Sequence, residues 1–171
     1  MQQLSRRRFL ALGVGATAVL TAAYAGLRQL GSYPELEGEF EHLTPKTAAI
    51  FAVVGDFLFP DDSVLPGRGG DVDTLLLIDR LLGEVNPQMR IMLLALPLAF
   101  EHGTALDRFG ARAMTDLTAE RRDEYLESWS RATDTTSAQL WLAMKTVFGL
   151  TYMDRLDVAR AMGLAPICRG S

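Results

Sequence analysis

The sequence predicts an all-α protein, with a single small domain of five to six helices behind an N-terminal signal or anchor helix. Apolar residues recur three and four positions apart through most of the chain, which is the period of an α-helix. Capping residues followed by proline, at Thr44-Pro45 and Asn86-Pro87, mark two helix starts. No stretch shows the period-two alternation of a half-buried strand. Helices packed around one core fit these observations.

The first 28 residues have the organisation of an export signal. A short basic stretch ends at Arg8, and residues 9–27 carry no charge. The stretch resembles a twin-arginine signal, which the twin-arginine translocase reads as an address. The positions that carry the resemblance are Ser5, Arg6, Arg7, Phe9 and Leu10. We therefore expect an exported protein, either periplasmic or anchored to the periplasmic face of the inner membrane.

The fate of this presequence stays open. Ala23-Tyr24-Ala25 is an A-x-A pattern, which predicts cleavage after Ala25. The uncharged run is also just about as long as the roughly 20 residues that a spanning helix needs. The alternative is therefore a retained signal-anchor, in which the arginines only obey the positive-inside rule.

Charge is distributed unevenly along the chain. The first 28 residues hold four basic side chains and no acidic one, whereas the rest holds 13 basic and 21 acidic side chains, a net charge of −8. An acidic domain argues against nucleic acid and against electrostatic binding to anionic lipid.

Three segments follow the presequence. Residues 29–43 form an acidic linker, which we expect to be a solvated spacer. The helical domain is predicted over residues 44–166, and residues 167–171 form a tail. The tail holds the only cysteine, Cys168, which is either a free thiol or a bridge to another chain.

The first helix of the domain is predicted to start after the Thr44 cap and to stop at Phe59-Pro60, because proline disfavours the helical conformation of the residue before it. A loop rich in Pro, Gly and Asp covers residues 60–70. The spacing of its acids does not match an EF-hand, and we interpret them as caps and turn residues: Asp61, Asp62, Asp71 and Asp73.

A second helix is predicted over residues 72–83, and a third starts at Asn86-Pro87. The third is apolar nearly all round, which predicts a central buried helix. Its methionines, Met89 and Met92, are interpreted as adaptable core filling. Pro97 lies inside this helix and predicts a kink or a break near Leu96.

Residues 103–118 predict a short helix and a turn, with Thr118 as the cap of the next helix, which extends to about Arg131. A long amphipathic helix is predicted over residues 135–150. The last is short, covers residues 155–162 and ends at Gly163, which suits a left-handed closing residue.

The residues show no recognisable catalytic arrangement. The only histidines are His42, in the linker, and His102, at a helix end, and they have no ligand-spaced partner. No nucleophile elbow or zinc-protease motif is present. Acidic residues on the helix after Thr118 are interpreted as a solvated face. We expect no catalysis, no metal and no cofactor on this chain.

Landmarks along residues 5–166 carry a resemblance to a family. After the twin-arginine signal, Leu43-Thr44-Pro45 opens a helix that ends in Phe59-Pro60-Asp61-Asp62. The later landmarks are Pro66-Gly67, Asp71-Val72, Ile78-Asp79, Arg90, Phe109, Leu117-Thr118, Trp129, Lys145, Tyr152 and Met162-Gly163-Leu164. This pattern resembles the gluconate 2-dehydrogenase subunit 3 family, the small or gamma subunit of membrane-associated FAD-dependent sugar and alcohol dehydrogenases.

The resemblance implies a non-catalytic small subunit. Such a subunit binds, helps to mature and co-exports a flavoprotein dehydrogenase subunit of the glucose-methanol-choline type. FAD is then held by the flavoprotein partner, and a cytochrome c subunit is a further possible partner. The alternative is a stand-alone membrane-anchored or periplasmic helical binding protein without a dehydrogenase partner.

Large aromatic side chains are candidate partner contacts, because interfaces favour aromatic residues. Each of them also fits the core of the domain. The candidates are Trp129, Trp141, Phe148 and Tyr152, and Cys168 is a candidate for a bridge to the partner.

Overall fold

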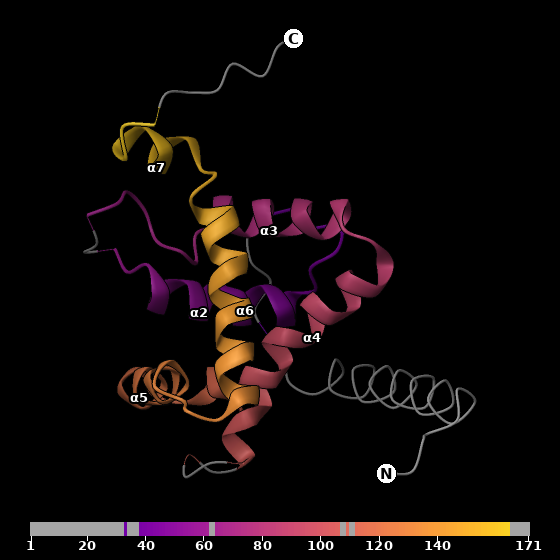
Figure 1. The fold of residues 1–171 in the computed structure, drawn as a ribbon, viewed down its shortest axis with the longest axis vertical. Coiled ribbons are helices and arrows are strands. Elements are labelled where there is room, and N and C mark those ends of the chain that lie inside the picture. The colour runs from indigo at the N-terminus through magenta and orange to yellow at the C-terminus, as the bar shows by residue number, and fades with distance from the viewer. Residues whose placement is uncertain (1–32, 34–37, 62–63, 107–108, 110–111, 165–171) are drawn as a thin grey trace, which may run out of the picture. The chain divides into compact units, whose positions relative to one another are not determined.

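A computed structural model describes residues 33, 38–61, 64–106, 109 and 112–164. The chain divides into two compact units after Ser32, and all described residues belong to the second unit. Six α-helices and two 3-10 turns make up this part, and it contains no strand (Figure 1). The predicted all-α, single-domain fold is confirmed. The elements are α2 (Pro45–Leu58), α3 (Val72–Glu84), α4 (Pro87–Gly103), η1 (Thr104–Leu106), η2 (Met114–Asp116), α5 (Ala119–Ser130), α6 (Thr135–Tyr152) and α7 (Leu156–Ala161).

Local capping chemistry sets the helix starts. The Thr44 hydroxyl accepts from the backbone N–H of Thr47, and the Thr47 hydroxyl accepts from that of Thr44, which forms a capping box. The Asn86 side chain accepts from the N–H of Met89 at 2.9 Å. Thr118 holds the predicted cap position of α5, although its side chain makes no capping hydrogen bond. These starts agree with the predicted ones.

The helix ends are equally local. α2 ends at Leu58, two residues before Pro60. After α7, Gly163 has a φ of +71°, and the next N–H, of Leu164, donates to the carbonyl of Ala159 at 2.9 Å. Glycine adopts this left-handed conformation without the steric cost of a side chain, as predicted.

The core forms around α6. Figure 1 shows that the N-terminal half of α6 lies beside α5 and that the C-terminal half of α6 lies beside α3. α6 also contacts α4. The rings of Phe148 on α6 and Phe51 on α2 meet edge to face, with centroids 6.1 Å apart. Both side chains are fully buried. Each large apolar side chain buried in this way stabilises the fold by about 1.5–3 kcal/mol.

One prediction for α4 is wrong. Its N-terminal half is not buried, since 43% of Met89 and 62% of Met92 is exposed, and burial starts only at Leu94. A helix that is apolar all round need not be covered all along its length. The other prediction was a kink or a break near Leu96, and of these the break does not occur, because α4 continues through Pro97 to Gly103. Burial of neighbours such as Leu98 offsets the roughly 3 kcal/mol that an internal proline costs.

The end of the acidic linker is not a solvated spacer, which corrects the prediction for residues 41–43. The backbone N–H groups of Glu41, His42 and Leu43 all donate to the Asp79 carboxylate of α3, at 2.9, 2.8 and 2.7 Å. Asp79 and the Leu43 side chain are both buried. This segment is therefore part of the domain surface, fastened to α3 immediately before α2 begins.

Candidate functional site

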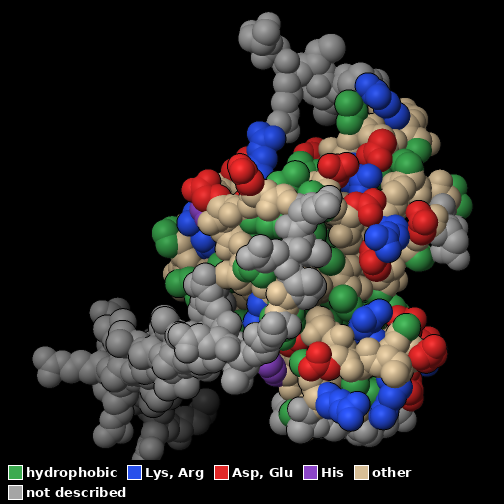
Figure 2. Space-filling model, turned by 180° about the vertical axis from the view of Figure 1, so that it is seen from behind, with side chains coloured by type: hydrophobic (Ala, Val, Ile, Leu, Met, Phe, Trp, Pro, Cys, Tyr) green, Lys and Arg blue, Asp and Glu red, His purple; other side chains and the backbone are tan. Residues whose placement is uncertain are grey.

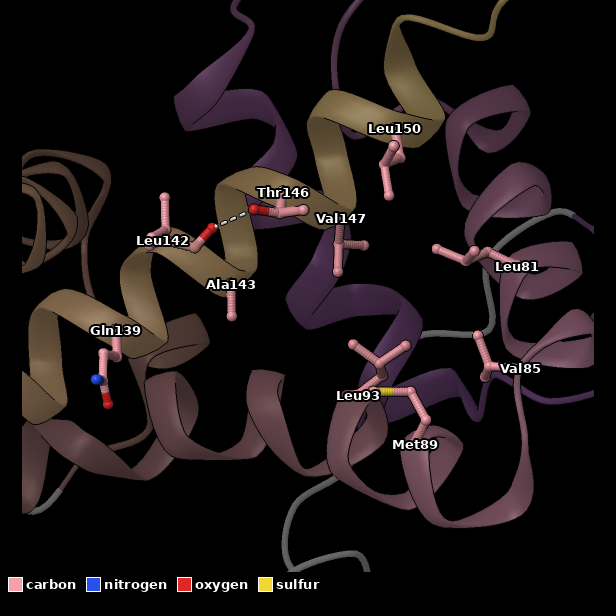
Figure 3. A pocket seen from close by; sticks show the side chains of 10 residues that line it. All are labelled: Leu81, Val85, Met89, Leu93, Gln139, Leu142, Ala143, Thr146, Val147 and Leu150. Carbon is pink, nitrogen blue, oxygen red and sulfur yellow. Dashed lines mark hydrogen bonds between the residues drawn. The ribbon is translucent and has the colours of Figure 1, made fainter.

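An apolar groove of about 480 Å³ lies between α6 on one side and α3 with the start of α4 on the other (Figure 3). We call it the α6 groove. In Figure 3, Leu81 points across it toward α6. Its lining residues are Leu81, Val85, Met89, Leu93, Gln139, Leu142, Ala143, Thr146, Val147 and Leu150.

The composition of α6 explains why this groove is apolar. Among the 18 residues of the helix, Lys145 is the only charged one. One face, with Met144 and Phe148, is buried in the core. Another face carries Leu142 and Leu150, which are 60% and 61% exposed. A helix with so little charge is normally covered over most of its surface.

The α6 groove offers almost no polar chemistry. Thr146 and Gln139 are its only polar side chains. The Thr146 hydroxyl donates to the carbonyl of Leu142 at 2.8 Å, within the same helix (Figure 3). Proton transfer or a covalent step needs a titratable or nucleophilic side chain in contact with the substrate. The lining provides no titratable side chain, and its one hydroxyl, on Thr146, has no base beside it within the lining.

A second region stands out at the other end of α4, where polar side chains are buried together. We call it the Glu101 cluster. Glu101 is fully buried and accepts hydrogen bonds from the Tyr33 and Thr115 hydroxyls, both at 2.5 Å, and from the Thr115 N–H at 3.2 Å. Beside it, the Lys46 ammonium lies 3.2 Å from Nε2 of His102. The cluster joins α2, α4 and η2 to Tyr33.

Burial changes the pKa values of three side chains in this cluster. It lowers the pKa of Lys46, an effect that the charge of Glu101 opposes. It also lowers the pKa of His102, and the neighbouring Lys46 lowers it further. Burial, together with the hydrogen bond to Glu101, raises the pKa of Tyr33 well above its ordinary value. Perturbed groups often mark active sites, but structural networks perturb pKa values too. Only 4% of Lys46 is exposed and Glu101 is fully buried, so these two charged groups lie inside the domain.

A third cluster holds the loop before α3. The buried Arg155 guanidinium contacts Asp157 at 2.8 Å, Asp71 at 3.3 Å and the carbonyl of Arg68 at 3.2 Å. Its hydrogen bond with Asp157 is the main cause that raises the pKa of Arg155 and lowers that of Asp157. Asp71 is thus an internal partner, in agreement with its interpretation as a turn residue. Among the described residues, no three His, Cys, Asp or Glu side chains gather as a metal site would require.

The structure corrects most of the predicted partner contacts. Trp141 is only 6% exposed, and Phe148 and Tyr152 are fully buried, so these three side chains belong to the core. Trp129 is partly exposed and packs on Phe100, with ring centroids 4.4 Å apart. The remaining predicted residues lie outside the described part of the chain, and these are Cys168, the export-signal residues Ser5, Arg6, Arg7, Phe9 and Leu10, and the cleavage residues Ala23 and Ala25.

The residues that do line the exposed apolar surface, such as Leu142, Leu150 and Met89, were not among the predicted contacts. One signal in the sequence points to them. An 18-residue helix with a single charge has more apolar surface than one core can cover. The choice of aromatic residues as anchors favoured the side chains that the core itself uses.

Comparison with known proteins adds no relative. No family model matches the chain, and neither a curated protein nor a solved structure matches it. Among the helices that the structure describes, none is long and apolar enough to cross a membrane.

Proposed function

We propose that this chain is the non-catalytic small subunit of an exported oxidoreductase complex. It binds a flavoprotein dehydrogenase subunit of the glucose-methanol-choline type, helps it to mature and exports it through the twin-arginine route. FAD belongs to the partner, and a cytochrome c subunit takes the electrons. The complex works in the periplasm or at the periplasmic face of the inner membrane.

The observation that carries the proposal is the α6 groove. Leu142 and Leu150 stay more than half exposed although they lie on the helix that builds the core. Exposed apolar surface of this kind marks an interaction site. The lining contains no acid or base that could activate its one hydroxyl, on Thr146, so the groove suits the binding of another protein better than the conversion of a substrate.

The sequence supplies the identity of the proposed partner. The family landmarks between residues 5 and 166 point to a subunit of flavin-dependent dehydrogenases. The twin-arginine motif supports joint export, because that route transports folded proteins. An acidic domain, with a net charge of −8 outside the first 28 residues, fits a protein partner better than nucleic acid.

The export part of the proposal is tested with the double variant Arg6→Lys, Arg7→Lys in the native host. Flavin-dependent dehydrogenase activity is measured in periplasmic and cytoplasmic fractions. We expect the activity to stay in the cytoplasm together with this chain. Arg28→Lys, which lies beyond the motif, is the matched control and leaves the distribution unchanged. Normal periplasmic activity in the double variant contradicts the proposal and favours the stand-alone binding protein.

A further inference from the structure

The α6 groove has almost nothing with which to hydrogen-bond a ligand. The Thr146 hydroxyl already donates to Leu142, and Gln139 lies at the N-terminal end of the lined part of α6. All the other lining side chains are apolar. Small-molecule sites place a few polar groups to orient their ligand, and this lining does not.

The lack of polar partners restricts the backbone of whatever protein segment fills the groove. A buried N–H or C=O group that loses water without gaining a partner costs about 1–3 kcal/mol. An extended segment needs the edge of a sheet to pair its backbone, and the described part of this domain has no strand. A helix satisfies its own backbone hydrogen bonds. It is therefore the segment that can enter an apolar groove without that cost.

The groove also has the length of a short helix. Its lining on α6 extends from Gln139 to Leu150, which corresponds to about 17 Å at 1.5 Å per residue. This is about three helical turns, so the occupant presents apolar side chains at positions i, i+3 or i+4, and i+7. Met89, exposed on the opposite wall, is an unbranched side chain that can adapt to them.

Charges lie only beside the groove. Arg80 and Glu84 directly precede the lining residues Leu81 and Val85 in the sequence, and their side chains pair with each other at 3.2 Å. Lys145 is exposed and directly precedes Thr146. A helix with an uncharged face toward the groove and a charged face toward water matches this distribution. Self-association through α6 would bring two copies of Lys145 into one interface, and like charges brought together are unfavourable.

From these observations we infer that the occupant of the α6 groove is an amphipathic helix of the partner subunit, about three turns long. This inference rests on the proposed function, because it names the element by which the flavoprotein is held. It adds that the partner is bound through a helix in the groove, and that the groove does not serve strand pairing, a small molecule or self-association.

Photo-crosslinking in the native host tests the inference on the full chain. A benzophenone amino acid replaces Leu142, Thr146 or Leu150 in turn, three positions that follow one another along the groove. The same replacement of Leu156, which is 52% exposed on α7 and does not line the groove, is the control. Crosslinked partner residues are then identified by mass spectrometry.

We expect the three groove positions to crosslink to one partner segment, at residues spaced three or four apart, and Leu156 to give no crosslink there. A spacing of two residues shows an extended segment, and crosslinks only to this chain show self-association. Either result overturns the inference, as does a flavoprotein that co-purifies without any crosslink from the groove. A helical segment from a protein without flavin supports binding of a helix in the groove, but it overturns the proposed function and with it the identity of the partner.

Discussion

The two ends of α4 differ in how their side chains are covered, although both ends lie at the edge of the core. At its C-terminal end, Glu101 is buried and all of its described contacts lie within the domain. At its N-terminal end, Met89 lines the α6 groove and stays exposed. The first region is complete without another molecule, whereas the second exposes apolar surface that water solvates poorly. The difference separates a structural cluster from the surface that we propose for binding.

The same contrast exists within α6. Phe148 faces the core and Leu150, two residues later, faces the groove. On the face of the domain shown in Figure 2, acidic and basic side chains are interspersed with apolar ones. The lining of the groove, in contrast, holds no charged residue. We therefore expect variants in the buried regions to lower the stability of the domain, and variants in the groove to lower the binding of the partner.

The largest effect on stability is expected for Phe148→Ala. This side chain is fully buried against Phe51, so its removal leaves a cavity in the centre of the core. We expect the free energy of unfolding in urea to fall by about 3–5 kcal/mol. A loss below 1 kcal/mol would show that α6 does not pack as described.

Glu101→Ala should come next. It leaves the hydroxyls of Tyr33 and Thr115 without their acceptor, inside a buried cluster. We expect a loss of about 3 kcal/mol in the free energy of unfolding. Glu120→Ala removes an exposed acid from the first turn of α5 and is the matched control, with an expected change within about 0.5 kcal/mol.

A smaller, pH-dependent effect is expected for His102. Its pKa is lower in the folded protein than its ordinary value of about 6.5, because burial and Lys46 disfavour the imidazolium. The neutral ring is therefore favoured by folding. This stability is fully present above about pH 6.5 and is lost as the pH falls through the lowered pKa of the folded state.

The variant His102→Gln keeps an acceptor near Lys46 and cannot ionise. We expect its unfolding free energy, measured by urea titration at pH 7.5 and at pH 5, to decrease less on acidification than that of the unmodified protein. His42→Gln controls for the loss of a histidine elsewhere. An unchanged pH dependence in His102→Gln would exclude this histidine as a source of acid sensitivity.

The smallest effect on stability is expected for Leu150→Gln in the groove. The side chain is already 61% exposed, and glutamine is a good helix former. We expect the free energy of unfolding to change by less than about 1 kcal/mol, only two residues from the most sensitive position. A larger loss would place Leu150 in the core rather than on a binding surface.

The comparison also shows what the sequence can predict. Helix starts were predictable because Thr44 and Asn86 cap groups only three residues away. The docking of residues 41–43 on Asp79 was not, because those partners lie 36 to 38 positions apart and the acidic composition suggested a solvated segment. Such long-range contacts leave no periodic signal in the sequence.

The site was harder to predict than the fold for a related reason. α6 has a single charged residue, so its pattern does not say whether an apolar side chain meets the core or a partner. Trp141 and Phe148 were equally suitable as anchors or as core residues, and the core takes both. Which side chains of α6 stay exposed depends on how α3 and α4 pack against it, and this packing leaves Leu142 and Leu150 exposed.

The central claim is that the α6 groove holds a flavoprotein partner, and one capture experiment tests it most directly. The full chain with a C-terminal affinity tag is produced in its native host, and the flavin that elutes with it is measured by fluorescence. The variant Leu142→Glu, Leu150→Glu is compared with Leu156→Glu, which places a single glutamate at an exposed leucine outside the groove.

Circular dichroism first establishes that all three proteins are equally helical. The account predicts that the unmodified chain and Leu156→Glu elute with flavin. The amount of flavin that elutes with the double groove variant should be at least about tenfold lower, which corresponds to a loss of about 1.4 kcal/mol or more in binding free energy. Flavin that elutes undiminished with the folded double variant would contradict the claim.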